Sequence, residues 1–325
     1  MSVMTLVKAI NNALDIKLND NKDVVLYGED VGYEGGVFRV TQGLQQKYGV
    51  ERVFDSPLAE SGIVGTAVGM AVAGMKPVVE MQFSGFAYPA FNQMISHVAR
   101  MRNRSRGRYT SSMVIRMPYG GGIKALEHHS ESMEAIYAHI PGLKVVIPST
   151  PHDAKGLLIS AIESEDPVIY MEPKRIYRAV KQEVSEDKFN VEIGKANVVQ
   201  QGKDVTVVSY GAMMRDTQKA LAMAKKAGIS VELIDLRTIY PLDVETIAQS
   251  IKKTGRIVTV AEAPTSFGIG SEITAIANDE AFLHLEAPPK RVTGFDTIVP
   301  LPQGEHHYMP SPEKIYHEIE KTAKF

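Results

Sequence analysis

The sequence predicts an α/β protein with two mostly parallel sheets that carry helices on their faces. Short apolar segments alternate with amphipathic segments at helical spacing, and this pattern occurs in two blocks of the 325-residue chain. A polar, charge-mixed stretch, Lys181–Lys188, is typical of a linker. We therefore expect a first domain over residues 1–185, a linker over 186–200 and a second domain over 201–325.

The first block contains apolar segments that we expect to form strands, at 23–28, 77–81, 113–117, 143–148 and 167–171. Helical patterns separate them, including Pro151–Glu163, and this order favours a parallel sheet. The first twenty residues mix charged positions with apolar positions at helical spacing, which indicates a helix and no secretory signal.

The second block repeats the pattern over a shorter length. Residues 204–211 are expected to form a strand ending in glycine, and Asp216–Ala227 a helix that Gly228 stops. Further strands are expected at 231–236 and 256–261, with a helix near 244–253 between them. The pattern predicts a smaller doubly wound domain.

The composition is that of an ordinary globular protein and excludes several kinds of site. Hydrophobic residues make up 44% and charged residues 23%, and the net charge of −2 gives no general attraction to nucleic acid or acidic membranes. The absence of cysteine excludes disulfides, thiolate metal sites and a cysteine nucleophile. With no targeting segment visible, we expect a cytoplasmic protein.

A single carboxylate, Glu60, stands at the head of an uncharged run, Ser61–Met75. We expect this run to be a buried helix with Ser56 as its N-cap and Pro57 at its first position. An ionised carboxylate there is costly unless something binds it, and a ring nitrogen of a cofactor is a suitable partner. The alternative is a carboxylate that only interacts with the helix dipole.

The run after Glu60 is rich in glycine. Gly62, Gly65 and Gly69 would let another backbone approach closely, which is more often a matter of packing than of cofactor binding. The run is also too short and too glycine-rich to indicate a transmembrane helix.

Three other motifs carry chemistry-bearing side chains. The triple glycine Gly120–Gly122 precedes His128 and His129, which is typical of a mobile active-site loop; a surface or interfacial pair is the alternative. His306–His307 is a second pair, for which a surface position is the simpler interpretation. Five arginines alternate between Arg100 and Arg108, and they indicate a solvated face or a subunit interface, since no aromatic residues of a nucleic-acid site are interleaved.

No glycine motif in the sequence forms a convincing phosphate cradle. There is no Walker loop, and no GxGxxG leads from a strand into a helix. The carboxylate signature of a magnesium-diphosphate site is also missing, and its nearest match is Gly28–Asp30.

Several segments together match one known family: Gly28–Val31, Gly35–Phe38, Arg52–Glu60, Gln82–Pro89, Leu126–Ser130, Pro141–Pro148 and Asp235–Thr238. With them the chain resembles, over essentially its whole length, the β subunit of the thiamine-diphosphate-dependent decarboxylating component of 2-oxo acid dehydrogenase complexes. The resemblance implies a pyrimidine-binding thiamine diphosphate domain followed by a smaller transketolase C-terminal-like α/β domain.

The resemblance implies roles for individual residues. Glu60 matches the glutamate that hydrogen-bonds a nitrogen of the cofactor's aminopyrimidine ring and so promotes loss of the thiazolium C2 proton. Apolar neighbours would favour its protonated form by desolvation. Phe86 matches the aromatic residue that stacks on the pyrimidine, and Glu29 and Leu58 match residues that line the same pocket.

Two further sites follow from the resemblance. His129 aligns with the family's catalytic histidine, with His128 beside it, and its implied roles are proton handling during reductive acylation of the lipoyl group and holding the substrate carboxylate. A potassium site formed largely by backbone carbonyls would fall at Met113, Ala161, Ile162, Ser164 and Asp166.

The implied active site is divided between two chains. An α subunit would hold the diphosphate with magnesium, while this chain binds the pyrimidine. The implied assembly is an α2β2 heterotetramer in which the second domain meets its twin and docks the lipoyl acyltransferase core. No nucleic acid or membrane partner is expected.

The expected substrate is a small 2-oxo acid. Glu172–Arg178 and Arg291–Thr297 look more like the branched-chain enzymes than the pyruvate enzymes, which implies a 3-methyl-2-oxobutanoate dehydrogenase-type oxidoreductase of branched-chain amino acid catabolism. The alternatives are a pyruvate or acetoin dehydrogenase β subunit and, in another class, a non-catalytic docking subunit.

Overall fold

The computed structural model describes residues 1–325, which divide into two compact units. The first unit comprises Met1–Tyr119 and Ile136–Ile193, and the second comprises Gly120–Ala135 and Gly194–Phe325. The division after Ile193 falls inside the linker expected over 186–200. The loop Gly120–Ala135 groups with the second unit because its backbone bonds side chains 141 and 183 residues further along the chain.

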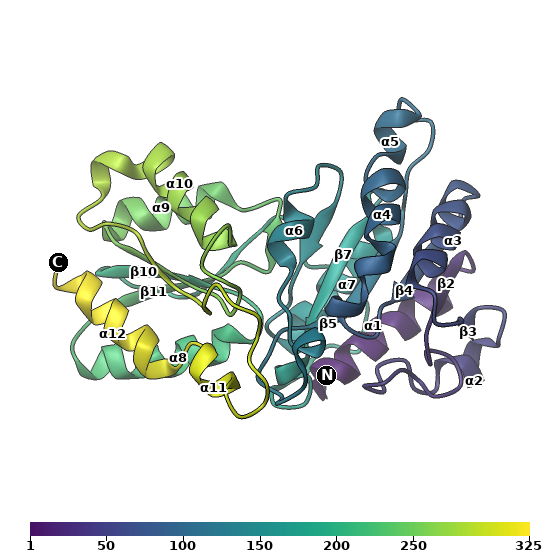
Figure 1. Ribbon diagram of the computed structural model, residues 1–325, viewed down its shortest axis with the longest axis horizontal. Coiled ribbons are helices and arrows are strands. Elements are labelled where there is room, and N and C mark those ends of the chain that lie inside the picture. Colours follow the sequence, from purple (N-terminus) through teal and green to yellow (C-terminus); the bar gives the residue numbers. More distant parts are fainter. The chain divides into compact units, whose positions relative to one another are not determined.

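The first unit is built on a sheet whose strands lie in the order β6-β7-β5-β4-β2-β3 (Figure 1). Every neighbouring pair in this order is parallel, as the alternating pattern predicts. The strands are β2 (Val24–Gly28), β3 (Val53–Asp55), β4 (Lys76–Glu80), β5 (Val114–Tyr119), β6 (Lys144–Val146) and β7 (Val168–Pro173). Because parallel strands end at the same edge, the residues that follow β2, β3 and β4 are brought together.

Helices cover this sheet. The helix predicted at Pro151–Glu163 is observed with those bounds as α7, and Thr150 caps it by accepting from Asp153 N–H. It packs against α1 (Leu6–Asp20). Helix α3 (Glu60–Val72) is as long as α7. The shorter elements are α2 (Leu44–Tyr48), η1 (Ser84–Phe86), η2 (Tyr88–Ala90), α4 (Phe91–Gln93), η3 (Met94–Val98), α5 (Met101–Arg104), α6 (Glu134–Ala138), which spans the division between the units, and η5 (Lys174–Ile176).

The interpretation of Lys181–Lys188 as a linker is wrong for its first half. Residues Lys181–Val184 form β8, which pairs antiparallel with β1 (Ser2–Thr5). The partner strand lies at the other end of this unit's sequence, so the polar local composition gave no sign of the pairing.

The expected start of the helix after Asp55 is also wrong. Helix α3 begins at Glu60 with Ala59 as its N-cap, and no side chain caps it. Ser56 N–H instead donates to the Gly28 carbonyl at 2.9 Å, which continues the pairing of β3 with β2. The cap signal of Ser56 and Pro57 was therefore overridden by strand pairing.

The second unit has a five-stranded sheet in the order β14-β13-β10-β11-β9, in which only β9 is antiparallel to its neighbour. Helices α8 and α12 lie on one face and α9 and α10 on the other (Figure 1). The elements are η4 (Glu127–His129), β9 (Asn197–Gln200), β10 (Val205–Ser209), α8 (Met213–Lys226), β11 (Val231–Asp235), β12 (Thr238–Tyr240), α9 (Val244–Thr254), β13 (Ile257–Val260), α10 (Ile269–Ala281), η6 (Phe282–His284), β14 (Lys290–Val292), α11 (Glu305–Tyr308) and α12 (Pro312–Ala323). None of the helices of the chain has both the length and the apolar composition needed to cross a bilayer.

Candidate active site

The pyrimidine-pocket candidates gather at the carboxyl edge of the first unit's sheet. Glu29 follows β2, Leu58 follows β3, Glu60 opens α3 and Phe86 ends the turn after β4. Burial raises the pKa of Glu29, and the nearby carboxylates of Glu60 and Asp30 raise it further. Glu29 is therefore protonated more readily than an ordinary glutamate, which suits hydrogen bonding to a ring nitrogen.

These candidates are only partly covered by the rest of the chain. Glu60 and Phe86 are half-buried, and the Leu58 side chain is 79% exposed. An exposed leucine beside a carboxylate pair and an aromatic ring offers an apolar and hydrogen-bonding surface of the kind that a heteroaromatic ring needs. The pyrimidine half of thiamine diphosphate would need residues of these types, and their role as its binding site stays a prediction.

Helix α3 is not the buried helix that its lack of charge predicted. Its buried residues are Ile63, Val64, Ala67 and Ala71. The opposite face, which includes Gly62, Thr66 and Gly69, is exposed. A Cβ at Gly69 would meet nothing within 4 Å, so the fold of this chain by itself does not require glycine there.

A row of aromatic rings leads from Phe86 into the first unit. The ring centroids of Phe86 and Phe83 lie 5.4 Å apart, those of Phe83 and Phe38 5.5 Å, and those of Phe38 and Tyr177 5.1 Å. Edge-to-face and tilted contacts at these distances are favourable and directional. The row therefore helps to fix the orientation of Phe86, and sequence reasoning did not identify its other members as site residues.

The row ends at a buried ion-pair network around Arg116. Arg116 Nε donates to Glu172 Oε1 at 2.7 Å and its Nη1 donates to Glu80 Oε2 at 2.7 Å, while Tyr177 OH donates to Glu172. Burial alone would lower the pKa of Arg116, but Glu172 and Glu80 raise it. The network ties β4, β5 and β7 together. An arginine inside the apolar strand 113–117 was the signal that could have predicted it.

The histidine loop, which we define as Gly120–Glu131, belongs to the second unit. His129 is half-buried at the end of the short turn η4, and His128 is exposed. His129 N–H donates to the Leu126 carbonyl at 3.0 Å. The second histidine pair, His306–His307, is exposed, as expected for a surface pair.

A buried carboxyl group, Glu134, follows the histidine loop. Its Oε1 accepts from Tyr210 OH at 2.6 Å, while its Oε2 is buried without a hydrogen-bond partner. Burial raises the pKa of Glu134 to about 7, and the nearby Glu262 contributes to the increase. The sequence did not single out this residue.

Of the residues expected to bind potassium, Ala161 and Ile162 end α7, Ser164 and Asp166 lie in the turn before β7, and Met113 precedes β5. Lys76 Nζ donates to the Ile162 carbonyl at 3.3 Å, Lys144 Nζ donates to Ser164 Oγ at 3.1 Å, and Ser112 Oγ donates to the Ser164 carbonyl at 2.7 Å. The other members of the set are also engaged: the Met113 carbonyl accepts from Val168 N–H, the Ala161 carbonyl accepts from Ser164 N–H, and the Asp166 carboxylate pairs with Arg102. Two ammonium groups thus supply positive charge near these residues, and the expected potassium site stays a prediction.

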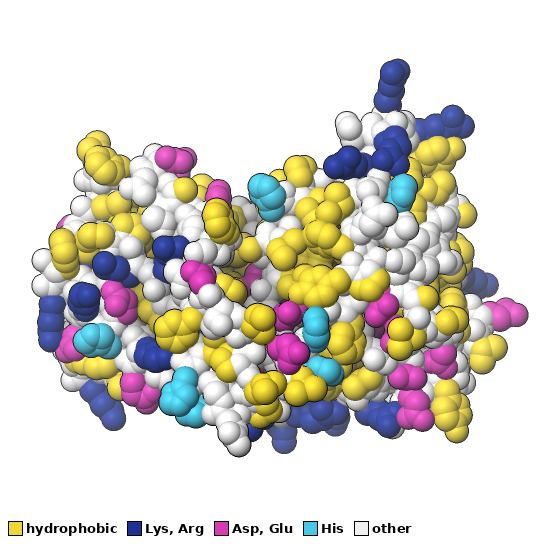
Figure 2. Space-filling view, in the orientation of Figure 1, with side chains coloured by type: hydrophobic (Ala, Val, Ile, Leu, Met, Phe, Trp, Pro, Cys, Tyr) yellow, Lys and Arg dark blue, Asp and Glu magenta, His cyan; other side chains and the backbone are white.

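The arginine run forms an exposed cationic surface. All five arginines from Arg100 to Arg108 are exposed, and Figure 2 shows Lys and Arg side chains gathered over α5. Arg102 pairs with Asp166 at 2.6 Å and with Glu165 at 3.3 Å. The run is exposed in the single chain, and the choice between a solvated face and a subunit interface stays open.

Comparison with known proteins agrees with the observed architecture. The transketolase pyrimidine-binding domain matches residues 2–180, and the transketolase C-terminal domain matches residues 194–315. A solved chain described as a split-gene transketolase, inactive beta4 tetramer, superposes with a TM-score of 0.81 at 23% identity and covers 99% of both chains, which shows the fold.

Similar sequences extend over the full length of the chain. A protein of Acholeplasma laidlawii named pyruvate dehydrogenase E1 component subunit beta is 57% identical and covers 100% of this chain and 99% of its own length. Proteins of the same name from Mycoplasma genitalium and Staphylococcus aureus are 52% and 49% identical and cover 98% and 100% of both chains.

Proposed function

Since the chain belongs to the family of E1 β subunits of 2-oxo acid dehydrogenases, we propose that it is the β subunit of a pyruvate dehydrogenase E1 component. This family depends on thiamine diphosphate, acts on an oxo group with a lipoyl acceptor, and works with an E1 α subunit. The observation that carries the proposal is that Glu60 lies near enough to Glu29 to raise its pKa, at the carboxyl edge of the first unit's sheet, where the turn after β4 ends in Phe86.

Pyruvate replaces the branched-chain substrate that we expected from two segments. The three relatives compared are 49% to 57% identical and bear the name of the pyruvate enzyme. In the first segment, Glu172 is engaged with Arg116 in the buried network. In the second, Arg291 Nη1 donates to the Thr265 carbonyl at 3.0 Å and to Ser271 Oγ at 2.7 Å. Both residues thus have roles in the fold that do not require contact with a substrate.

The residues of the first unit would prepare the cofactor. When bound, thiamine diphosphate supplies the carbon nucleophile for the 2-oxo group and accommodates the electrons left by decarboxylation. Glu60 would hold a proton at the pyrimidine ring nitrogen, and Phe86 would fix the plane of the ring. Glu29, whose pKa burial raises, would retain its proton more readily and so limit the repulsion between the two carboxyl groups.

The exposed face of α3 is the contact that we propose for the α subunit. It carries no charged residue after Glu60, and its glycines would permit a close approach of backbones. The same face continues to the pocket, so an α subunit seated there would cover Leu58 and exclude water from Glu60. The diphosphate and magnesium would then be held by that subunit, in an α2β2 heterotetramer that serves the lipoyl acyltransferase core.

The test is reconstitution with an E1 α subunit. Calorimetry should detect thiamine diphosphate binding to the assembled tetramer, and a panel of pyruvate, 3-methyl-2-oxobutanoate and acetoin should give the highest kcat/KM for pyruvate. Preference for another member of the panel would reassign the substrate. A tetramer that binds no cofactor would support the non-catalytic docking subunit instead.

A second experiment addresses the proposed role of His129. Substitution His129→Ala should reduce acyl transfer to a lipoyl acceptor more strongly than turnover with an artificial electron acceptor, because only the lipoyl reaction needs a proton at the dithiolane sulfur. The neighbouring exposed residue provides the control, His128→Ala. Equal losses in the two assays would contradict the role.

A further inference from the structure

The backbone of the histidine loop is largely irregular and has positive φ angles at three positions. Gly120 and Gly122 each have φ of +84° and Lys124 has φ of +58°, while η4 is its only helical turn. Backbone N–H groups in such a segment need partners from outside it. Within the loop, Gly120 N–H donates to the Glu131 carbonyl at 3.0 Å and closes the segment at its base.

The next N–H groups of the loop are bound by two carboxylates of the second unit. Gly121 N–H donates to Glu262 Oε2 at 2.7 Å. Gly122 N–H and Lys124 N–H donate to the two oxygens of Glu305 at 2.8 and 2.9 Å. Hydrogen bonds from N–H groups to a carboxylate are stronger than those to a neutral acceptor, and these carboxylates are 3% and 4% exposed. The loop is therefore anchored at three points within four residues, Gly121, Gly122 and Lys124.

The triple glycine provides the space for these anchors. A Cβ at Gly120 would lie 2.8 Å from both oxygens of Glu262, and one at Gly121 would lie 3.2 Å from Glu305 Oε1. Side chains at these positions would push the carboxylates away from the N–H groups. Steric contact with the two carboxylates thus explains why glycine stands at Gly120 and Gly121, without any need for a phosphate-binding role.

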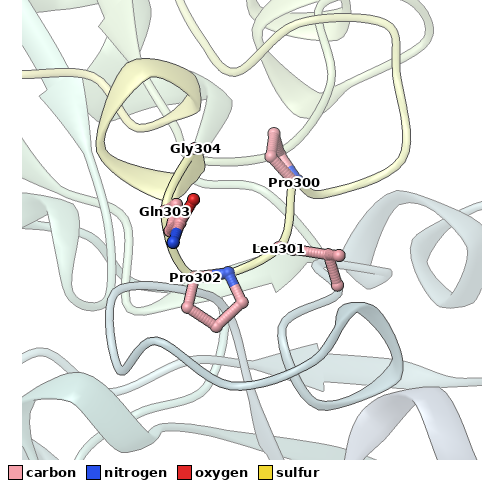
Figure 3. Close-up of a pocket in the computed structure, with 5 residues that line it drawn as sticks. All are labelled: Pro300, Leu301, Pro302, Gln303 and Gly304. Atoms are coloured by element: carbon pink, nitrogen blue, oxygen red, sulfur yellow. The ribbon is translucent and has the colours of Figure 1, made fainter.

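Both anchors come from defined places in the second unit. Glu262 follows β13, at the carboxyl edge of the sheet. Glu305 is the first residue of α11 and directly follows the segment Pro300–Gly304, which lines an open hollow (Figure 3). Gly304 N–H donates to the Leu301 carbonyl at 2.8 Å, a turn that presents Glu305 to the loop.

We propose that Glu262 and Glu305 are positioning residues that hold the histidine loop in the conformation in which His129 transfers protons. The proposal rests on the function proposed for His129. It assigns to the C-terminal part of the chain a contribution to the reaction that is separate from docking or dimer formation. Neither carboxylate needs to touch the substrate.

The experiment uses the reconstituted tetramer with Glu262→Gln and Glu305→Gln, and with Glu313→Gln, an exposed residue of α12, as the matched control. Hydrogen–deuterium exchange of the peptide covering residues 120–131 should become at least tenfold faster in the first two variants and stay unchanged in the control. Lipoyl acyl transfer should fall at least tenfold while turnover with an artificial acceptor falls less than threefold.

A further variant keeps the proposal testable if the glutamine variants fail to fold. Gly121→Ala leaves both carboxylates in place but brings a methyl group against Glu305, and it should produce the same two effects in a weaker form. Unchanged exchange in both glutamine variants would overturn the proposal. Faster exchange with equal losses in both assays would also overturn the positioning role. If His129→Ala keeps full acyl transfer, the function proposed for His129 fails, and the exchange data still decide whether the carboxylates hold the loop.

Discussion

Two glycine-rich segments adjoin the candidate site residues. They differ in how closely the rest of the chain packs against their glycines. In α3, which begins with Glu60, a Cβ at Gly69 would meet no neighbour and one at Gly62 would meet only Ala59, at 3.6 Å. In the histidine loop, Gly120 has φ of +84° and a Cβ there would lie 2.8 Å from the Glu262 carboxylate. The glycine of the loop is required by the fold of this chain, and that of α3 is not.

The two segments also differ in what the rest of the chain supplies to them. The loop's N–H groups are bound by buried carboxylates of the same unit. By contrast, α3 presents an uncharged exposed face, and Leu58 beside Glu60 is 79% exposed. An uncharged exposed helix face of this kind is available for contact with another chain, as the proposed function requires. Under the proposed function, the exposed glycines of α3 would be needed only for contact with a partner chain.

The largest expected effect is the loss of turnover on substitution of Glu60, which tests whether this carboxylate takes part in the reaction. Glu60→Gln removes the carboxylate but keeps the size and most of the polarity of the side chain. Turnover of the reconstituted tetramer should fall by about 10²–10⁴-fold, the usual contribution of a positioned acid or base. The melting temperature should stay unchanged, because Glu60 is half-buried and caps nothing in the fold. Near-normal turnover would remove Glu60 from the mechanism.

The next largest expected effect is on the pH dependence of the free energy of unfolding, through the buried Glu134 that follows the histidine loop. Burial raises the pKa of Glu134 from 4.5 to about 7, so between these pH values the folded state binds a proton that the unfolded state has lost. The free energy of unfolding should therefore decrease as the pH rises through this window and level off above about pH 7, by up to about 3 kcal/mol in all. Urea unfolding across this range measures it.

The matching variant is Glu134→Gln, which stays neutral and can still accept from Tyr210. It should remove most of this pH dependence and be more stable than the natural chain at pH 8. A pH dependence of the same size in the variant would assign the titration to another group.

A pair of glycine substitutions tests the comparison directly. Gly120→Ala forces a side chain into a left-handed backbone conformation and against the Glu262 carboxylate, and should reduce the free energy of unfolding by about 1–3 kcal/mol. Thermal or urea unfolding of the chain alone is sufficient to measure it. A neutral effect would mean that the loop can rearrange at little cost.

The smallest effect has the opposite sign. Gly69→Ala should stabilise the isolated chain by about 0.5–1 kcal/mol, since alanine favours a helix and meets no neighbour. The same substitution should weaken assembly with the α subunit, measured by calorimetric titration, whereas Lys225→Ala on α8 should not. Unchanged affinity would place the α-subunit contact elsewhere.

Local sequence patterns predicted the regular elements well where both period and boundary signals agreed. Helix α7 has the predicted bounds, because Thr150 caps it and Pro151 occupies its first position. The same kind of signal failed at Ser56, whose backbone pairs with β2. The strand at Lys181–Val184 was missed because its partner β1 is distant in sequence. These differences arise from contacts that no local pattern contains.

The candidate site residues were predicted from the sequence, whereas the groups that surround them were found only in the structure. Motif resemblance singled out Glu60, Phe86 and His129, whose roles remain predictions. It did not indicate the ion-pair network of Arg116 or the buried Glu134. These groups depend on which strands are neighbours, and the order of strands along the chain does not determine that.

The sequence by itself determined the two α/β blocks, the uncharged helix behind Glu60 and the glycine-rich loop before the histidines. Periodicity and composition specify such features because each depends on neighbours within a few turns or strands. Only the tertiary structure showed at which glycines a side chain would clash with the rest of the chain. Glu262 and Glu305 come within hydrogen-bond distance of the loop from 141 and 183 residues away, and such distant contacts are fixed by packing of the whole unit.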